Sequence, residues 1–281
     1  MPLDDLFEST TMCEVASGFQ FTEGPVWMPG GYLLFSDIPA STIYRLDPGA
    51  GRAVPWRHPS GNSNGLTLDR QGRLIACEHG NRRVSRTEPD GTVTALATHY
   101  QGKRLNSPND VVVRSDGTIY FTDPPYGIGP EEKELPFHGV YRIDPSGRLH
   151  LLSEDMDRPN GLAFSPDESV LYIDDTTRRQ IRAFDVCADG ALANERLFAL
   201  MESDMEGGPD GMKVDVEGNI YCTGPGALWV YRPTGELVGH VVGPQRPANI
   251  AFGGADRRTI YLTSRTSVYT LRARIPGVSV V

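Results

Sequence analysis

Four oxygen-bearing side chains occupy the same position in four repeated segments of this chain. They are Glu23, Asn109, Asn160 and Asp210. Two carboxylates and two amide carbonyls make an all-oxygen set, which hard divalent cations prefer, whereas zinc usually recruits histidine or cysteine. If the fold brings these side chains together, the sequence predicts a divalent-cation site with coordination positions left open for water and a ligand.

The four belong to a wider set of six anchor residues. Each anchor is followed, 14 or 15 positions later, by a partner residue at the end of an apolar run. The anchors are Glu23, Asn64, Asn109, Asn160, Asp210 and Asn249. The partners are Asp37, Glu78, Asp123, Asp175, Gly224 and Ser264. Successive anchors lie 39 to 51 residues apart, which is the length of one blade of a β-propeller.

Asparagine and aspartate also begin strands for a purely structural reason, because their side chains bond to the backbone of turns. Six anchors in register favour a shared site over six separate strand caps. For Asn64 and Asn249 two roles stay open, namely binding of water or substrate near the ion, or capping of a strand.

The elements that would carry these anchors have the pattern of β-hairpins. After an anchor the chain alternates apolar and polar residues, as at Leu66 and Leu68. A turn such as Ser115-Asp116-Gly117 follows, and then a run rich in aromatic and β-branched residues, such as Ile119-Tyr120-Phe121. Third and fourth strands follow in most repeats. We therefore predict an all-β fold, a six-bladed β-propeller with four-stranded antiparallel blades, as a single domain over residues 1–281.

The last repeat is too short to make a complete blade. Only 32 residues follow Asn249, and four strands with their loops need more. Residues 11–19 precede the first anchor and can supply the missing strand. We predict that they pair beside the C-terminal strand of blade six, which closes the ring and hides two sheet edges.

Composition narrows the class of protein. The chain has 281 residues, a formal net charge of −9 and no run of lysine and arginine, which argues against a nucleic acid or an anionic membrane surface as partner. No apolar stretch approaches the ~18 residues of a spanning helix, and the N-terminal MPLDDLFEST shows no secretory signal. Four cysteines without CxxC spacing are predicted to be buried free thiols, which suits the cytoplasm. A processed N-terminus would leave the periplasm as the alternative. Nothing in the sequence indicates an oligomeric state.

Four strings of residues carry a resemblance to a known family. They are Phe21-Thr22-Glu23-Gly24-Pro25-Val26-Trp27, Asn106-Ser107-Pro108-Asn109-Asp110, Arg158-Pro159-Asn160-Gly161-Leu162 and Gly208-Pro209-Asp210-Gly211. From about Gly18 to Leu271 the chain resembles the senescence marker protein / gluconolactonase / luciferin-regenerating enzyme family of six-bladed propellers. The stretch Leu105–Gly127 looks most like its bacterial gluconolactonases.

This resemblance implies a function and a cofactor. It implies one divalent cation of the calcium type on the propeller axis, held by Glu23, Asn109, Asn160 and Asp210, with magnesium, manganese or zinc as alternatives. It also implies hydrolysis of sugar lactones, with Asp210 placed to act as a base. The implied partner is therefore a small-molecule sugar lactone.

The resemblance says less about which residues contact the substrate. In the senescence marker branch an arginine stands two residues before the third-blade asparagine, where this chain has Ser107. Arg104 and Asn106 are candidates to replace that contact. Hairpin geometry returns each partner residue to the rim of its anchor, so Asp123 and Asp175 are expected there, to bind sugar hydroxyls or to hold neighbouring loops. Asn64 is a further candidate.

The chemistry of a lactone, a cyclic ester, needs a polarised carbonyl and an activated water. Asp210 is the first candidate for the base, because it could both touch the ion and face an open cavity. A carboxylate bound to a cation is a weaker base, which makes His79 the rival. The ordinary pKa of a histidine suits proton transfer near neutral pH.

Two other functions stay open. The same propeller and ion would support hydrolysis of phosphotriesters or fluorophosphates, with a phosphoryl oxygen in place of the carbonyl, and a more apolar pocket would favour it. A propeller can also be a non-catalytic interaction platform, because a fold alone does not determine function. An exposed apolar patch without an open metal position would favour that role.

Overall fold

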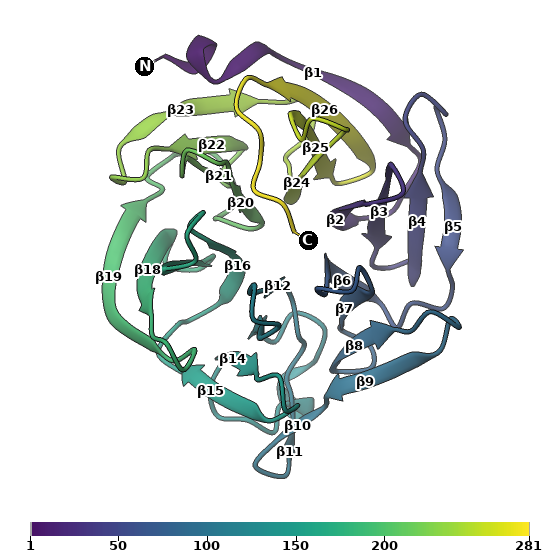
Figure 1. Cartoon of the computed structure of the whole chain (residues 1–281), viewed down its shortest axis with the longest axis vertical. Helices are drawn as coiled ribbons and strands as arrows, with labels where there is room; N and C mark the ends of the chain where they lie inside the picture. Colours follow the sequence, from purple (N-terminus) through teal and green to yellow (C-terminus); the bar gives the residue numbers. More distant parts are fainter. Residues whose placement is uncertain (1, 281) are drawn as a thin grey trace.

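Six four-stranded antiparallel sheets surround a central axis in the computed structural model, which describes residues 2–280 (Figure 1). Blades one to three consist of β2 (Thr22–Met28), β3 (Tyr32–Asp37), β4 (Thr42–Leu46) and β5 (Val54–Arg57); β6 (Ser63–Leu68), β7 (Leu74–Glu78), β8 (Arg83–Thr87) and β9 (Val93–Ala97); and β12 (Val111–Val113), β13 (Ile119–Asp123), β14 (Gly139–Ile143) and β15 (Leu149–Ser153).

Blades four to six complete the ring. They consist of β16 (Pro159–Phe164), β17 (Val170–Asp175), β18 (Gln180–Val186) and β19 (Leu192–Leu200); β20 (Met212–Val214), β21 (Ile220–Thr223), β22 (Ala227–Tyr231) and β23 (Leu237–Val242); and β24 (Asn249–Gly253), β25 (Thr259–Ser264), β26 (Ser267–Ala273) and β1 (Phe7–Ser17). Outside the blades lie the ribbon of β10 (His99–Tyr100) and β11 (Lys103–Arg104) and the short 3-10 helices η1 (Leu3–Asp5) and η2 (Pro130–Glu132). The predicted six-bladed propeller is confirmed.

The N-terminal strand closes blade six, as the short last repeat predicts. β1 runs along the outside of the blade, antiparallel to β26, with Cys13 opposite Thr270 and Ser17 opposite Ser267 (Figure 1). The strand begins at Phe7, four residues before the predicted start at residue 11. Phe7 is buried and its ring contacts the edge of Tyr221 in blade five. This apolar contact at the strand start explains the extension.

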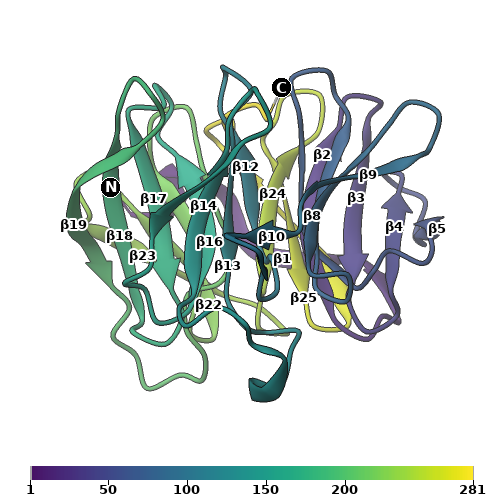
Figure 2. The same ribbon diagram turned by 90° about the horizontal axis from the view of Figure 1, so that it is seen from below.

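The hydrophobic core lies between neighbouring blades. One cluster joins Ile75 and Val84 of blade two to Phe121 and Tyr141 of blade three. Because every blade packs on two others in a closed ring, each sheet has both faces covered. Seen from the side, the strands of adjacent blades run along the axis, so their ends meet at two opposite faces (Figure 2). No helix in residues 2–280 is long and apolar enough to cross a membrane.

Glycines after two of the anchors let the innermost strands approach the axis. A Cβ atom on Gly24 would lie 1.9 Å from the carbonyl oxygen of Asn64, and one on Gly161 would lie 2.0 Å from that of Asp210. Any larger residue would push one blade away from the next. The Gly that follows an anchor is therefore what allows anchors of adjacent blades to touch.

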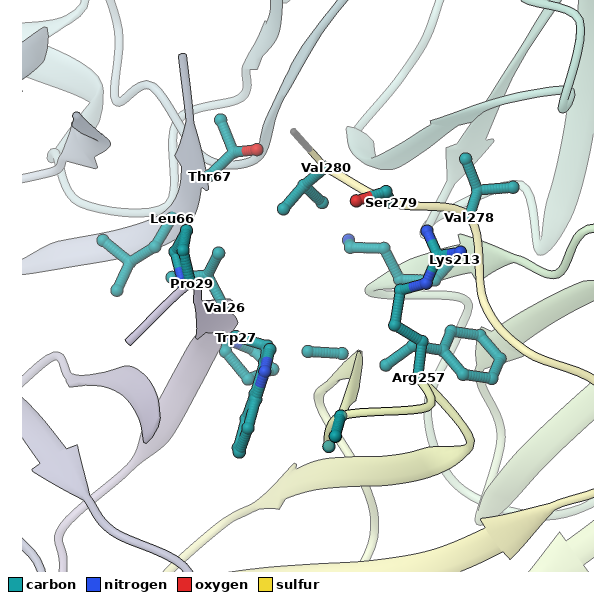
Figure 3. Close-up of a pocket in the computed structure, with 15 residues that line it drawn as sticks. Val26, Trp27, Pro29, Leu66, Thr67, Lys213, Arg257, Val278, Ser279 and Val280 are labelled. Carbon is teal, nitrogen blue, oxygen red and sulfur yellow. The ribbon is translucent and has the colours of Figure 1, made fainter. Parts of the chain in front are cut away.

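The C-terminal segment lies over the face of the ring opposite the anchors. Residues 274–280 cross that face toward the centre of the ring (Figures 1 and 2). There the segment bonds to inner strands, because the N–H of Val278 donates to the carbonyl oxygen of Val214 at 3.0 Å. A cavity of about 250 Å³ lies beneath, with Trp27 and Leu66 across from Val280 (Figure 3). This cavity holds no anchor side chain, which leaves the other face for the chemistry.

Candidate active site

Five of the six anchors line one cavity of about 420 Å³ at the open face of the ring. Its floor is made by the starts of the inner strands, and its walls by the loops that lead into them. The lining consists of Phe21, Glu23, Ile38, Pro39, Asn64, His79, Asn109, Tyr126, Arg158, Asn160, Thr176, Gly207, Gly208, Asp210, Arg246 and Pro247. The sixth anchor, Asn249, is buried outside this lining, where its Oδ1 accepts the N–H of Ile250 at 2.8 Å. This bond is a strand cap, but Asn249 Nδ2 also donates to Asp110 Oδ2 at 3.5 Å and the side chain bonds to Glu23, so both predicted roles of Asn249 stay open.

A chain of side-chain hydrogen bonds connects the anchors of blades two to five. Asn64 Nδ2 donates to Asn109 Oδ1 at 2.7 Å, and Asn109 Nδ2 donates to Asn160 Oδ1. Asn160 Nδ2 then donates to Asp210 Oδ1 at 2.8 Å. Residues that lie up to 146 positions apart in the sequence (Asn64 to Asp210) thus meet around one axis. The structure brings the predicted set together, and its role in holding an ion stays a prediction.

The two carboxylates of the set are held without a counter-ion. Glu23 is 3% exposed, and its Oε2 accepts the N–H of Gly24 at 2.8 Å. Burial, and then the charges of Asp210 and Asp110, raise the pKa of Glu23 well above its ordinary value. Neither Glu23 nor Asp210 forms an ion pair with any side chain among residues 2–280.

Asp210 has the electrostatic environment of a proton acceptor. Its pKa is raised to about 7: burial is the main cause and the charge of Asp110 adds to it, while the bond from Asn160 and the charges of Arg246 and Arg265 act in the opposite direction. The Asp210 side chain faces the cavity, and the residue is only partly buried. This exposed side weakens the effect of burial, so a pKa near 7 is the upper end of what this site imposes.

These features fit a hard divalent cation. Two buried carboxylates that repel each other gain from a positive charge between them, and a half-turn of a terminal amide exchanges its oxygen and nitrogen. Within the described chain no three His, Cys, Asp or Glu side chains group around a point that could hold a metal. The candidate set has only two such residues, and Asn109 and Asn160 would supply the remaining oxygens. A cation here would therefore depend on amide as well as carboxylate ligands.

His79 lines the cavity but is poorly suited to act as a base. It is 6% exposed, and its Nε2 lies 3.1 Å from Asn109 Oδ1 and 3.4 Å from Asn64 Nδ2. Burial lowers its pKa to about 4, although the bond to Asn109 raises it slightly. The ring is therefore neutral at pH 7 and a weak proton acceptor. Its contact with Asn109 is suited to holding that amide in position.

Two predicted substrate residues are engaged by the backbone outside the cavity. Asp123 accepts the N–H groups of Asn106 and Ser107, both at 2.7 Å, and is fully buried. Asp175 accepts those of Asp157 and Arg158 at 2.7 and 3.1 Å. Each carboxylate thus ties down the loop that enters its own blade. Hairpin geometry predicted the correct face, but these oxygens point at the loop, so we no longer assign them to substrate.

Arg104 and Asn106 also lie outside the cavity lining. Asn106 is buried, and its Nδ2 donates to the carbonyl oxygens of Asp123 and Phe137, both at 3.0 Å. Arg104 belongs to the outer ribbon β11, where it donates to the carbonyl oxygen of Asn81 at 3.3 Å. The expectation that they replace the missing arginine contact is therefore corrected. Of the predicted substrate contacts, only Asn64 faces the cavity.

Three residues of the cavity wall, Thr176, Arg158 and Arg246, were not identified as site residues from the sequence. Thr176 accepts from the Tyr126 hydroxyl at 3.0 Å, and Asn160 Nδ2 donates to both oxygens, at 3.2 Å to Tyr126 and 3.1 Å to Thr176. Arg158 and Arg246 stand two and three residues before the anchors of blades four and six. Their position in loops that open onto the anchor face is the signal that could have identified them.

The chain is similar to known proteins along almost its whole length. The chain is 33% identical to a gluconolactonase of Zymomonas mobilis over 98% of this chain and 85% of the relative. It is 29% identical to regucalcin of Xenopus laevis, covering 90% of this chain and 85% of that protein.

Among solved structures, a gluconolactonase from Xanthomonas campestris superimposes with a TM-score of 0.88 and 34% identity, covering 96% of this chain and 92% of that one. The family described as the SMP-30/Gluconolactonase/LRE-like region matches residues 21–266. The match includes the inner strands of all six blades and every anchor, and on this evidence the chain is a member of that family.

Proposed function

We propose that this protein is a divalent-cation-dependent hydrolase that opens the ring of sugar lactones. The observation that carries the proposal is the pair of carboxylates, Glu23 and Asp210, left without a counter-ion beside two amide side chains at the floor of an open cavity. The similarity to the Zymomonas mobilis and Xanthomonas campestris gluconolactonases supports the choice of substrate class.

Glu23, Asn109, Asn160 and Asp210 would hold the cation. Oxygen donors of this kind suit calcium, and magnesium, manganese or zinc are the alternatives. When bound, a divalent cation would supply Lewis acidity toward the ester carbonyl and offset negative charge that develops on its oxygen.

The chain's own groups divide the remaining work. Asp210 takes the proton from the attacking water, because its carboxylate faces the cavity and its pKa is about 7 before a cation lowers it. Asn160 orients this carboxylate through its Nδ2 bond at 2.8 Å. His79, with a pKa of about 4, is the weaker candidate for this step.

The cavity wall matches a small polyhydroxylated ring. Asn64, Tyr126 and Thr176 present amide and hydroxyl groups, while Phe21 and Ile38 offer apolar surface for the carbon face of a sugar. A volume of about 420 Å³ accommodates a single monosaccharide lactone, since sites for small ligands begin at roughly 300 Å³.

A direct test is the rate of lactone opening, followed by acid release from glucono-1,5-lactone with the spontaneous rate subtracted. We expect turnover by the protein with calcium, and loss of turnover after chelation that calcium restores. Asp210→Asn should lower kcat by at least ~10² if Asp210 is the base. A full rate in the rigorously metal-free protein would contradict the proposal.

No feature of the cavity favours the two alternatives. Phosphotriester hydrolysis calls for a more apolar pocket, whereas the floor of this cavity is made of asparagine amides and carboxylates and its wall carries the hydroxyl groups of Tyr126 and Thr176. An interaction platform would not need an open cavity over unpaired carboxylates. The cytoplasmic location stays a prediction that cell fractionation would test. Cys77 and Cys222 are buried free thiols, as predicted, whereas Cys13 is exposed and Cys187 is half-buried.

A further inference from the structure

Three arginines surround the mouth of the candidate active site. Arg158 and Arg246 line the cavity, and the guanidinium of Arg265 lies 5.3 Å from the ring centre of Phe21, which also lines it. They belong to loops of blades four and six, on either side of the blade-five loop that carries Asp210. In a chain with a formal net charge of −9, this gathering of positive charge is local to the site.

The guanidinium of Arg158 is held in place with its donors free. It lies 5.1 Å from the ring centre of Tyr126, a distance typical of cation–π contacts. Its backbone N–H is fixed by Asp175 at 3.1 Å. Within residues 2–280 its side chain makes no hydrogen bond or ion pair, although a guanidinium has five N–H donors.

The other two arginines are also weakly engaged. Arg246 has one ionic partner among the described residues, Glu206 at 3.4 Å, and that carboxylate is 91% exposed, so the pair contributes little. Among residues 2–280 the guanidinium of Arg265 forms no hydrogen bond or ion pair and lies over the ring of Phe21. By contrast, Arg57 of blade one and Arg83 of blade two share the buried carboxylate of Glu78. Arginines elsewhere in the protein thus pair with buried carboxylates, whereas the arginines at the mouth of the cavity have almost no carboxylate within ion-pair distance among the described residues.

Asp210 explains only part of this charge. Arg246 and Arg265 lower its pKa and so help to keep it ionised. A divalent cation would neutralise the carboxylates of Glu23 and Asp210, which leaves the three guanidinium groups with only the exposed carboxylate of Glu206 as an ion-pair partner among the described residues. Arg158 in particular has no role in such a cation site. Its guanidinium lies over the ring of Tyr126 and pairs with no carboxylate among the described residues.

We propose that the lactone accepted by this site carries an anionic group on its exocyclic carbon, outside the ring, and that Arg158, assisted by Arg246, binds it. The chemical class is a lactone with a carboxylate, sulfonate or phosphate substituent, because a planar guanidinium matches the oxygens of all three. The inference rests on the proposed lactonase function and narrows its substrate.

The experiment compares two substrates that differ in one charged group. Values of kcat/KM are measured for glucono-1,5-lactone and for 6-phosphoglucono-1,5-lactone, with C6 carboxylate and sulfonate analogues to identify the preferred oxyanion. We expect the native protein to favour an anionic lactone by about tenfold or more, the effect of one charge-assisted hydrogen bond. Arg158→Gln should lower that preference about tenfold, and added salt should weaken it in the native protein.

A matched control removes the same charge elsewhere. Arg70 is exposed in the turn between β6 and β7, at the end of the strand opposite its anchor, and makes no side-chain contact among residues 2–280. Arg70→Gln should leave the preference unchanged, and thermal unfolding confirms that both variants fold. Equal kcat/KM for neutral and anionic lactones, or equal loss in both variants, would overturn the proposal.

Binding separates this inference from the proposed function. Calorimetry with gluconate and 6-phosphogluconate, which need no ring opening, should show tighter binding of the phosphorylated acid to the native protein. Arg158→Gln should reduce that difference. If no lactone is opened but this binding difference holds, the hydrolase proposal fails and the anion site stands. If lactones are opened and neither acid is preferred, the anion site is refuted.

Discussion

Replacing Asp210 by asparagine should make the stability of the metal-free protein depend less on pH between about pH 4 and pH 7. The pKa of Asp210 rises from 3.8 to about 7 in the folded protein, and one pKa unit corresponds to about 1.4 kcal/mol. A carboxyl whose folded pKa exceeds its unfolded value contributes stability that is fully present below the unfolded pKa. That contribution is lost as the pH rises through the folded pKa. The window therefore extends from roughly pH 4 to pH 7.

The expected loss across this window is up to about 4 kcal/mol, of which about 3 kcal/mol falls between about pH 5 and pH 8. This is a ceiling, because Asp210 has one side toward the solvent of the cavity. The assay is urea unfolding of chelator-treated protein at the two pH values. Asp210→Asn keeps the shape of the side chain and one oxygen for Asn160, but it cannot ionise. Between the two pH values its free energy of unfolding should therefore fall less than that of the native protein, by up to about 3 kcal/mol.

The second half of the experiment repeats the unfolding measurement with calcium added. At a hundredfold excess over its dissociation constant, a ligand bound only by the folded state stabilises it by about 2.7 kcal/mol. We expect this gain at pH 8 for the native protein and for Asp123→Asn, a control that removes a buried carboxylate, also with a pKa of about 7, outside the cavity. Asp210→Asn should lose most of the gain. Equal pH dependence and equal calcium response in the native protein and Asp210→Asn would refute the reasoning.

Three further outcomes follow from the structure. Gly161→Ala should destabilise the protein by several kcal/mol in urea unfolding, roughly the upper range for single substitutions, because its Cβ would lie 2.0 Å from the Asp210 carbonyl oxygen. Gly31→Ala, at a φ of +82° with open space around it, should cost only about 1 kcal/mol, and equal costs would argue against the close approach. The His79 ring should remain neutral in NMR titration until about pH 4, and a midpoint near 6.5 would restore it as a candidate base. Deletion of residues 1–17 removes β1 and exposes the edge of β26, so the truncated protein should aggregate or unfold at lower temperature; unchanged thermal stability would show that ring closure does not need this strand.

The propeller could be predicted because its physical cause repeats along the chain. An anchor, a turn and an apolar run recur in each segment. This local pattern is enough to define a β-hairpin whose second strand ends beside the anchor. The start of β1 was placed four residues late because Phe7 gains its partner, Tyr221, from a distant blade. Nothing local to the N-terminus reveals that contact.

The walls of the cavity were harder to predict than its floor. The floor consists of anchors at strand starts, whose positions follow from the hairpin pattern. The walls come from loops of unequal length, and Arg158 and Tyr126 meet only because two such loops fold toward each other. Asp123 and Asp175 illustrate the same limit, since hairpin geometry placed them at the right face. Whether their oxygens turned to the cavity or to their own loops depended on the loop path.

A crystal structure of the protein grown with calcium tests the cation centre most directly. We predict a single ion on the ring axis, within bonding distance of oxygens from Glu23, Asn109, Asn160 and Asp210, with a coordination position facing the cavity. An axis without an ion, in a protein that opens lactones at full rate in the same calcium-containing buffer, would contradict the account.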